Sequence, residues 1–109
     1  MSIQNTRYNK KLTAEECDQI FDHMAQNNTR KYNRLKAAEE LQELALVLVQ
    51  KVNKPEKVTD QAIIDEIGDV KIRLEVLQRL FSSDAINTRI NNKLNQFQRF
   101  IESEKHKNI

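Results

Sequence analysis

Apolar residues recur three and four positions apart in four segments of this 109-residue chain. Residues at that spacing share one face of an α-helix, so each segment predicts an amphipathic helix. The predicted helices span about 13–27, 30–52, 60–81 and 84–103. We expect one helical domain at 13–104, a flexible arm at 1–12 and a frayed tail at 105–109. The predicted fold class is therefore all-α, a four-helix bundle with short loops.

The breaks between the segments carry signals for helix ends. Thr13 and Glu16 form a capping-box pattern, in which each side chain binds a free backbone N–H group at the helix start. Thr29 and Thr59 stand at cap positions before the second and third helices. Pro55, the only proline, ends the second helix because proline cannot continue a helix interior.

The third and fourth segments differ in the width of their apolar faces. The fourth has one narrow stripe, with the basic residues elsewhere on its surface. The stripe consists of Ile86, Ile90, Leu94, Phe97 and Ile101. The third has apolar residues on more than one side, more than a lone four-helix monomer of this size easily covers. We therefore expect a homodimer or a homotetramer.

Two acidic pairs lie within the second and third segments. Glu40 and Glu43 are three residues apart, and Glu66 and Asp69 repeat that spacing. On a helical wheel Glu40 borders an apolar arc, and apolar residues flank Glu66 and Asp69. The short connection around Pro55 favours antiparallel helices, which places the two pairs level within about one turn. The pattern predicts four inward carboxylates around one centre.

A cluster of four desolvated carboxylates is unfavourable unless a cation compensates its charge. Ligand oxygens without Cys or His suit a hard cation, so we predict Mg²⁺, with Mn²⁺ as a possible substitute. Zinc is disfavoured. A di-iron bundle would require Glu-x-x-His pairs, and neither His23 nor His106 has a Glu three residues earlier. An isolated acidic motif is usually a solvated helix face, but a second pair at matching height favours a metal site.

Composition limits the functional classes. The formal net charge is only +2 with both signs mixed along the chain, so we expect no nucleic-acid partner. Cys17 is the only cysteine, which excludes an internal disulfide and fits a reducing compartment. The longest apolar run, Leu44 to Val49, is far shorter than the roughly twenty residues of a membrane span. Without a signal peptide, the predicted location is the cytoplasm.

The two acidic motifs resemble those of the all-α nucleoside triphosphate pyrophosphatases, the MazG-like superfamily. The first is Glu39-Glu40-Leu41-Gln42-Glu43, and the second is Glu66-Ile67-Gly68-Asp69 within the more specific stretch 65–70. The resemblance covers about residues 36–99. It implies a MazG-type helical fold, assembled at least as a dimer, that cleaves a nucleoside triphosphate to the monophosphate and pyrophosphate with Mg²⁺.

The resemblance also implies roles for particular residues. Its metal ligands, which are also its catalytic carboxylates, match Glu40, Glu43, Glu66 and Asp69. Lys93 matches a family lysine that contacts the phosphates. Phe97 and Arg73 depart from the family pattern, which often has Asn and an aromatic or apolar residue at these positions. The expected reaction is in-line attack of a metal-activated water on the α-phosphorus.

Several positions allow two interpretations. Lys36 is either a phosphate contact or a helical partner of Glu40 one turn away, and we favour the partner slightly. Arg73 either stabilises charge on the leaving pyrophosphate or forms a surface salt bridge. Gly68 marks either a close approach by a helix or ligand, or a tolerated helix glycine. Tyr32 and Phe21 can stack on a base, but packing is favoured.

Two alternatives to the enzyme stay open. One is a non-catalytic helical interaction module whose acidic cluster is a structural or vestigial metal site, which would explain the unusual Phe97 and Arg73. The other is an acidic-faced protein-interaction bundle without metal. The second alternative is weaker because it leaves inward carboxylates uncompensated.

Overall fold

The computed structural model describes residues 10–107 of the chain. These residues form four α-helices and one short 3₁₀ helix, and no strand occurs among them. The all-α prediction is confirmed. The chain divides into two compact units, Met1–Leu77 and Gln78–Ile109. Within the described range, no helix is long and apolar enough to cross a membrane.

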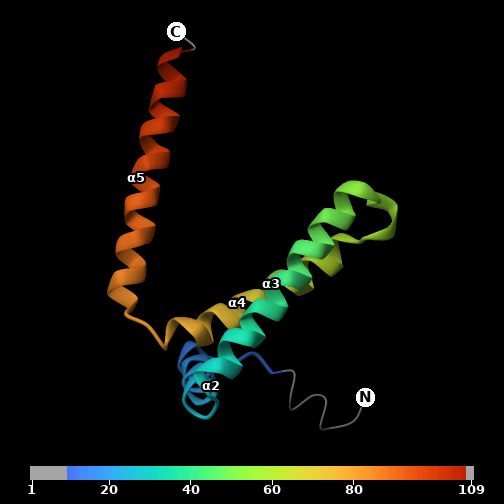
Figure 1. Ribbon diagram of the computed structural model, residues 1–109, viewed down its shortest axis with the longest axis vertical. Helices are drawn as coiled ribbons and strands as arrows, with labels where there is room; N and C mark the ends of the chain where they lie inside the picture. The colour runs from blue at the N-terminus through green and yellow to red at the C-terminus, as the bar shows by residue number, and fades with distance from the viewer. Residues whose placement is uncertain (1–9, 108–109) are drawn as a thin grey trace. The chain divides into compact units, whose positions relative to one another are not determined.

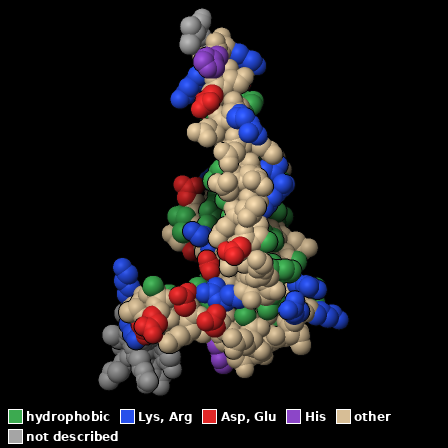
Figure 2. Space-filling model, turned by 90° about the vertical axis from the view of Figure 1, so that its left-hand side faces the viewer, with side chains coloured by type: hydrophobic (Ala, Val, Ile, Leu, Met, Phe, Trp, Pro, Cys, Tyr) green, Lys and Arg blue, Asp and Glu red, His purple; other side chains and the backbone are tan. Residues whose placement is uncertain are grey.

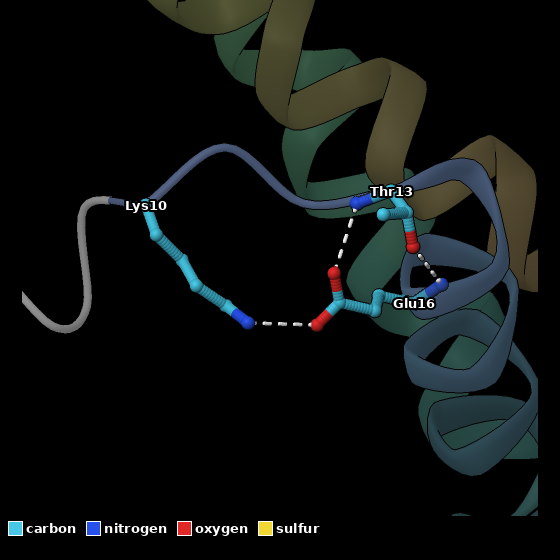
Figure 3. A network of polar contacts seen from close by, with 3 residues as sticks. All are labelled: Lys10, Thr13 and Glu16. Carbon is cyan, nitrogen blue, oxygen red and sulfur yellow. Dashed lines mark hydrogen bonds and ion pairs between the residues drawn. The ribbon is translucent and has the colours of Figure 1, made fainter.

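Helix α2 spans Ala14–Gln26 and starts at the predicted capping box. The Glu16 backbone N–H donates to Thr13 Oγ1 at 3.1 Å, and the Thr13 backbone N–H donates to Glu16 Oε1 at 3.0 Å. Lys10 pairs with the same carboxylate at 2.9 Å (Figure 3). The Thr13 backbone hydrogen bond, followed by the Lys10 contact, lowers the pKa of Glu16 to about 2.

The structure describes only residues 10–12 of the arm predicted at 1–12. Residues 1–9 lie outside the described range, but Lys10 is held by its ion pair with Glu16. Leu12 lines an apolar pocket together with Phe21 of α2 and with Ile72. Lys10 and Leu12 therefore contact the first unit, although both side chains are more than a third exposed.

Helices α3, Arg30–Asn53, and α4, Asp60–Gln78, lie side by side and run in opposite directions (Figure 1). Each begins at its predicted threonine: Thr29 Oγ1 accepts from the Tyr32 backbone N–H and Thr59 Oγ1 from that of Ala62. The 3₁₀ helix η1, Pro55–Lys57, connects them. We call α3, η1 and α4 the hairpin.

Lys51, at the end of α3, holds the connection of the hairpin together. Its ammonium donates to the backbone oxygens of Val58 at 2.8 Å and of Pro55 at 3.2 Å. It also lies 3.8 Å from the carboxylate of Asp60, the first residue of α4. One side chain thus contacts both sides of the loop, which fixes where α4 starts relative to α3.

The buried core among the described residues is small. Its members are Ala25, Asn33, Ala37, Val70 and Val76. The apolar arc of α3 that Glu40 borders is mostly open, because Leu48 is exposed and Val52 is 80% exposed. Ala37 alone in that arc is buried. An arc this wide exceeds what one neighbouring helix covers.

Helix α5 spans Ser83–Lys107. The third helix was predicted to reach residue 81, but α4 ends at Gln78, because the next residues form the turn in which the Phe81 N–H donates to Gln78 O. The fourth was predicted to end at 103 with a frayed tail from 105. The helix instead continues to Lys107, since basic side chains in a last turn interact favourably with the negative end of the helix dipole.

No residue of α5 is buried. The predicted apolar stripe lies along this one helix, and half or more of the surface of Ile90, Leu94, Phe97 and Ile101 is exposed. Acidic, basic and His side chains gather near its C-terminal end (Figure 2). The helix is thus amphipathic, with its apolar side chains along one face.

Candidate metal centre

Three of the predicted ligands come together between α3 and α4. Glu40, Glu43 and Glu66 each offer one carboxylate oxygen, and these three oxygens lie within 4.8 Å of one another. Glu40 and Glu43 are one turn apart on α3, so they share a face, and Glu66 reaches them from the antiparallel α4. The convergence expected from the short loop is therefore present for three of the four predicted ligands, whereas the predicted inward position is wrong for Glu43 and Asp69, which are both exposed.

The carboxylates of the centre influence one another's titration, and the pKa values of Glu40 and Glu66 both rise. Burial raises the pKa of Glu40, and the charge of Glu43, a hydrogen bond with Glu43 and the charge of Asp69 add to that rise. Burial also raises the pKa of Glu66, followed by the charges of Asp69 and Glu40. Asp69 thus acts on both groups, although its carboxylate is not one of the three within 4.8 Å. All four predicted ligands belong to one electrostatic cluster.

Two oxygens in this cluster have no hydrogen-bond partner. Glu40 Oε2 and Glu66 Oε2 are both buried from solvent, and neither contacts a donor among the described residues. A buried carboxylate oxygen without a donor is unfavourable, and two in one cluster are more so. A hard divalent cation fits these residues, because it prefers carboxylate oxygens and replaces the missing donors.

Lys36 does not pair with Glu40 as we predicted. Its ammonium lies 3.3 Å from Glu39 Oε2 and 5.7 Å from the centre of the Tyr32 ring. Glu39 is on the exposed side of α3, whereas the Glu40 carboxylate turns inward, so Glu39 is the partner that a lysine in water reaches. The Tyr32 ring therefore contacts the Lys36 ammonium.

The other two predicted phosphate contacts differ in their position. Arg73 is half-buried on α4, one turn beyond Asp69. Lys93 is half-buried on α5, which belongs to the second unit. Their contacts with substrate stay predictions.

Gly68 lies between Glu66 and Asp69, and the structure separates its two interpretations in part. A Cβ built at this position meets no atom within 4 Å. Close approach by a helix among the described residues is therefore not the reason for this glycine. The remaining interpretations are approach by a ligand or by a second copy of the chain, and a tolerated helix glycine.

The sequence reading missed Lys51 and Asn33. Lys51 positions the two helices of the centre, and the signal for it was a lysine in a last helical turn just before the proline loop. Asn33 is 1% exposed and its side-chain nitrogen lies 3.5 Å from Ala25 O. No sequence signal distinguishes this buried asparagine from the chain's many exposed ones.

Comparisons with family models, curated proteins and solved structures give no match for this chain. The likeness of the acidic motifs to the MazG-like superfamily therefore rests on the sequence, and the geometry of the centre rests on the structure.

Proposed function

We propose that this protein is a Mg²⁺-dependent nucleoside triphosphate pyrophosphohydrolase. It would cleave an NTP or dNTP to the nucleoside monophosphate and pyrophosphate. The observation that carries the proposal is the pair of buried, unpartnered oxygens of Glu40 and Glu66 inside a cluster of carboxylates. The motif spacing that resembles the MazG-like superfamily supplies the substrate class.

Each residue of the centre has a role in the proposed reaction. Glu40, Glu43, Glu66 and Asp69 would hold the cation. When bound, Mg²⁺ or Mn²⁺ neutralises the triphosphate and makes the α-phosphorus more electrophilic. Water attacks that phosphorus, pyrophosphate leaves, and a carboxylate of the cluster accepts the proton of the water.

Three basic residues would bind the triphosphate. Arg73 is one turn from Asp69 and would stabilise charge on the leaving pyrophosphate. Lys36 would contact a phosphate after exchanging Glu39 for it, and Lys93 would do so from α5. These contacts belong to a MazG-type fold that acts in the cytoplasm as a homodimer or homotetramer.

A panel of common and modified NTPs and dNTPs with Mg²⁺ tests the activity, with pyrophosphate and the monophosphate identified as products. We expect turnover of at least one nucleotide. Glu43→Gln should lower kcat by about 100-fold or more, because a ligand that acts on the transition state is lost. Glu39→Gln, on the exposed side of the same helix, is the matched control and should keep most activity. No turnover with Mg²⁺ or Mn²⁺ would refute the enzyme.

The second candidate function is an interaction module with a structural metal site. It is favoured by Lys36, a proposed phosphate contact that Glu39 and Tyr32 already engage. Thermal unfolding with added Mg²⁺ separates the candidates. A cation at 100 times its Kd stabilises a fold by about 2.7 kcal/mol.

We expect wild type and Glu39→Gln to gain this stability and Glu66→Gln to lose most of the gain. Stabilisation without turnover would favour the structural site. If Mg²⁺ and Mn²⁺ stabilise neither wild type nor Glu39→Gln, the metal centre itself is refuted.

A further inference from the structure

The ammonium of Lys51 has three acceptors, and all three lie beyond the end of α3. It donates to the backbone oxygen of Val58 at 2.8 Å and to that of Pro55 at 3.2 Å, and it lies 3.8 Å from Asp60 Oδ1. An ammonium has three N–H donors, so these contacts can use its full capacity. Because Asp60 is the first residue of α4, Lys51 links the last turn of α3 to the first turn of α4.

The backbone hydrogen bonds of the connection are local by comparison. The Lys54 N–H donates to Gln50 O at 2.7 Å, and the Lys57 N–H donates to Lys54 O at 3.0 Å, and neither bond reaches α4. The Lys51 side chain crosses from one helix to the other. Its ion pair contributes little, because the Asp60 side chain is 87% exposed. The two hydrogen bonds to carbonyl oxygens provide most of the link, since a charged donor strengthens them.

This link determines the register of the two helices at the acidic centre. Lys51 and Asp60 lie side by side, so positions along α3 and α4 can be counted from this pair. Glu43 lies eight residues before Lys51, and Glu66 lies six residues after Asp60. At a rise of about 1.5 Å per residue, the two glutamates differ by about 3 Å in height, which is less than one helical turn.

The centre tolerates little change in this register. The ligand oxygens of Glu40, Glu43 and Glu66 lie within 4.8 Å of one another. A shift of α4 by one turn would move Glu66 about 5.4 Å along the helix axis, which is more than that separation. The cation would then keep ligands from α3 alone. Its affinity depends on the number of carboxylates that reach it, so the register governs binding.

We propose that Lys51 is a positioning residue of the metal centre: through its contacts with the connection and with Asp60, it holds Glu66 level with the glutamates of α3. It thereby raises the affinity for the cation. The inference rests on the proposed function, because it requires the cation. Lys51 is about 12 Å from Glu43 along α3, so it acts through the position of α4 and not by touching the cation or the substrate.

Calorimetric titration of Mg²⁺ into the folded full-length variants measures this effect. Lys51→Met keeps an unbranched side chain and removes the ammonium. We expect it to raise the Kd for Mg²⁺ by about tenfold, because the aligned position of α4 becomes a minor fraction of the folded protein. Lys51→Arg keeps the charge and has several donors, so it should restore Kd to within about threefold of wild type.

Lys54→Met is the matched control. It removes the same charge from the same connection, but Lys54 forms its hydrogen bonds there with its backbone. We expect Kd to change less than about threefold. Loss of a positive charge alone would tighten cation binding in both variants, because like charges repel. A rise in Kd for Lys51→Met therefore separates positioning from long-range electrostatics.

The outcomes separate this inference from the proposed function. If wild type binds neither Mg²⁺ nor Mn²⁺, both are overturned. If wild type binds Mg²⁺ and Lys51→Met binds it equally tightly, only the positioning role is overturned. That result, together with a lower unfolding temperature of Lys51→Met without metal, would assign Lys51 to stability alone.

Wild-type protein provides a second test, which decides if Lys51→Met fails to fold. Coupling between two sites is reciprocal, so bound Mg²⁺ should strengthen the contacts of Lys51. Mass spectrometry after brief chemical acetylation should show that saturating Mg²⁺ slows modification of the Lys51 amine about fivefold or more. Lys54 is the internal control and should change less than about twofold. Equal effects on the two amines, or none on Lys51, would overturn the proposal.

Discussion

In the hairpin, Ala37, Val70 and Val76 are buried, whereas α5 has no buried residue over its whole length. Both regions carry helical apolar periodicity, and both are helical. In the hairpin, α4 covers part of α3 because a short loop returns the chain. The apolar stripe of α5 has no such neighbour within its own unit. Helix formation and burial are therefore separate outcomes here: local sequence determines the first, and a facing surface determines the second.

A charged substitution at one position in each region should show the difference between the two regions most clearly. Val76 is 1% exposed, so Val76→Asp buries a charge and should lower the free energy of unfolding by about 3 kcal/mol or more. Leu94→Asp should change it by about 0.5 kcal/mol or less in protein dilute enough to be monomeric. Urea denaturation measures both. Equal losses would mean that α5 is packed as tightly as the hairpin.

The capping box of α2 should give a smaller effect that depends on pH. Thr13→Ala should destabilise the first unit by about 1 kcal/mol, because the Glu16 N–H loses its acceptor. The pKa of Glu16 is about 2, below its ordinary value of 4.5, so its contribution is present above pH 4.5 and is lost as pH falls toward 2.

Denaturation of wild type and Glu16→Gln between pH 2 and 7 measures this dependence. The difference between the two proteins should shrink as pH falls. An equal change for Lys105→Gln, far from this box on α5, would show that the effect is general and not due to the cap.

Gly68→Ala should have the smallest effect and the opposite sign. The added Cβ meets no atom within 4 Å, so the substitution should stabilise α4 by about 0.5–1 kcal/mol through helix propensity. Thermal unfolding measures the gain. A loss of stability or of self-association would mean that a ligand or second copy approaches α4 at this glycine.

Features set by nearby residues were predictable from the sequence. The starts at Thr13, Thr29 and Thr59 follow from side chains that bind N–H groups within one turn. The meeting of Glu40 with Glu66 followed from loop length, because a short loop leaves two helices few relative positions.

Features that depend on distant surfaces were not predictable. Neither the exposure of Val52 nor the extension of α5 to Lys107 was predicted, because a helical wheel does not reveal what covers a face or where fraying begins. Lys36 pairs with Glu39 and not with Glu40 because the Glu40 carboxylate is turned inward. This orientation is a property of the folded hairpin.

The Lys51 contacts constrain the length of the connection between α3 and α4. Because the ammonium spans from Pro55 to Asp60, the loop cannot take up an extra residue without losing a contact. One residue added within α4 before Glu66 would turn that carboxylate by about 100°. Tolerance to insertions should therefore be lowest in this hairpin, and sequences that share the centre should preserve its spacing even where the loop residues differ.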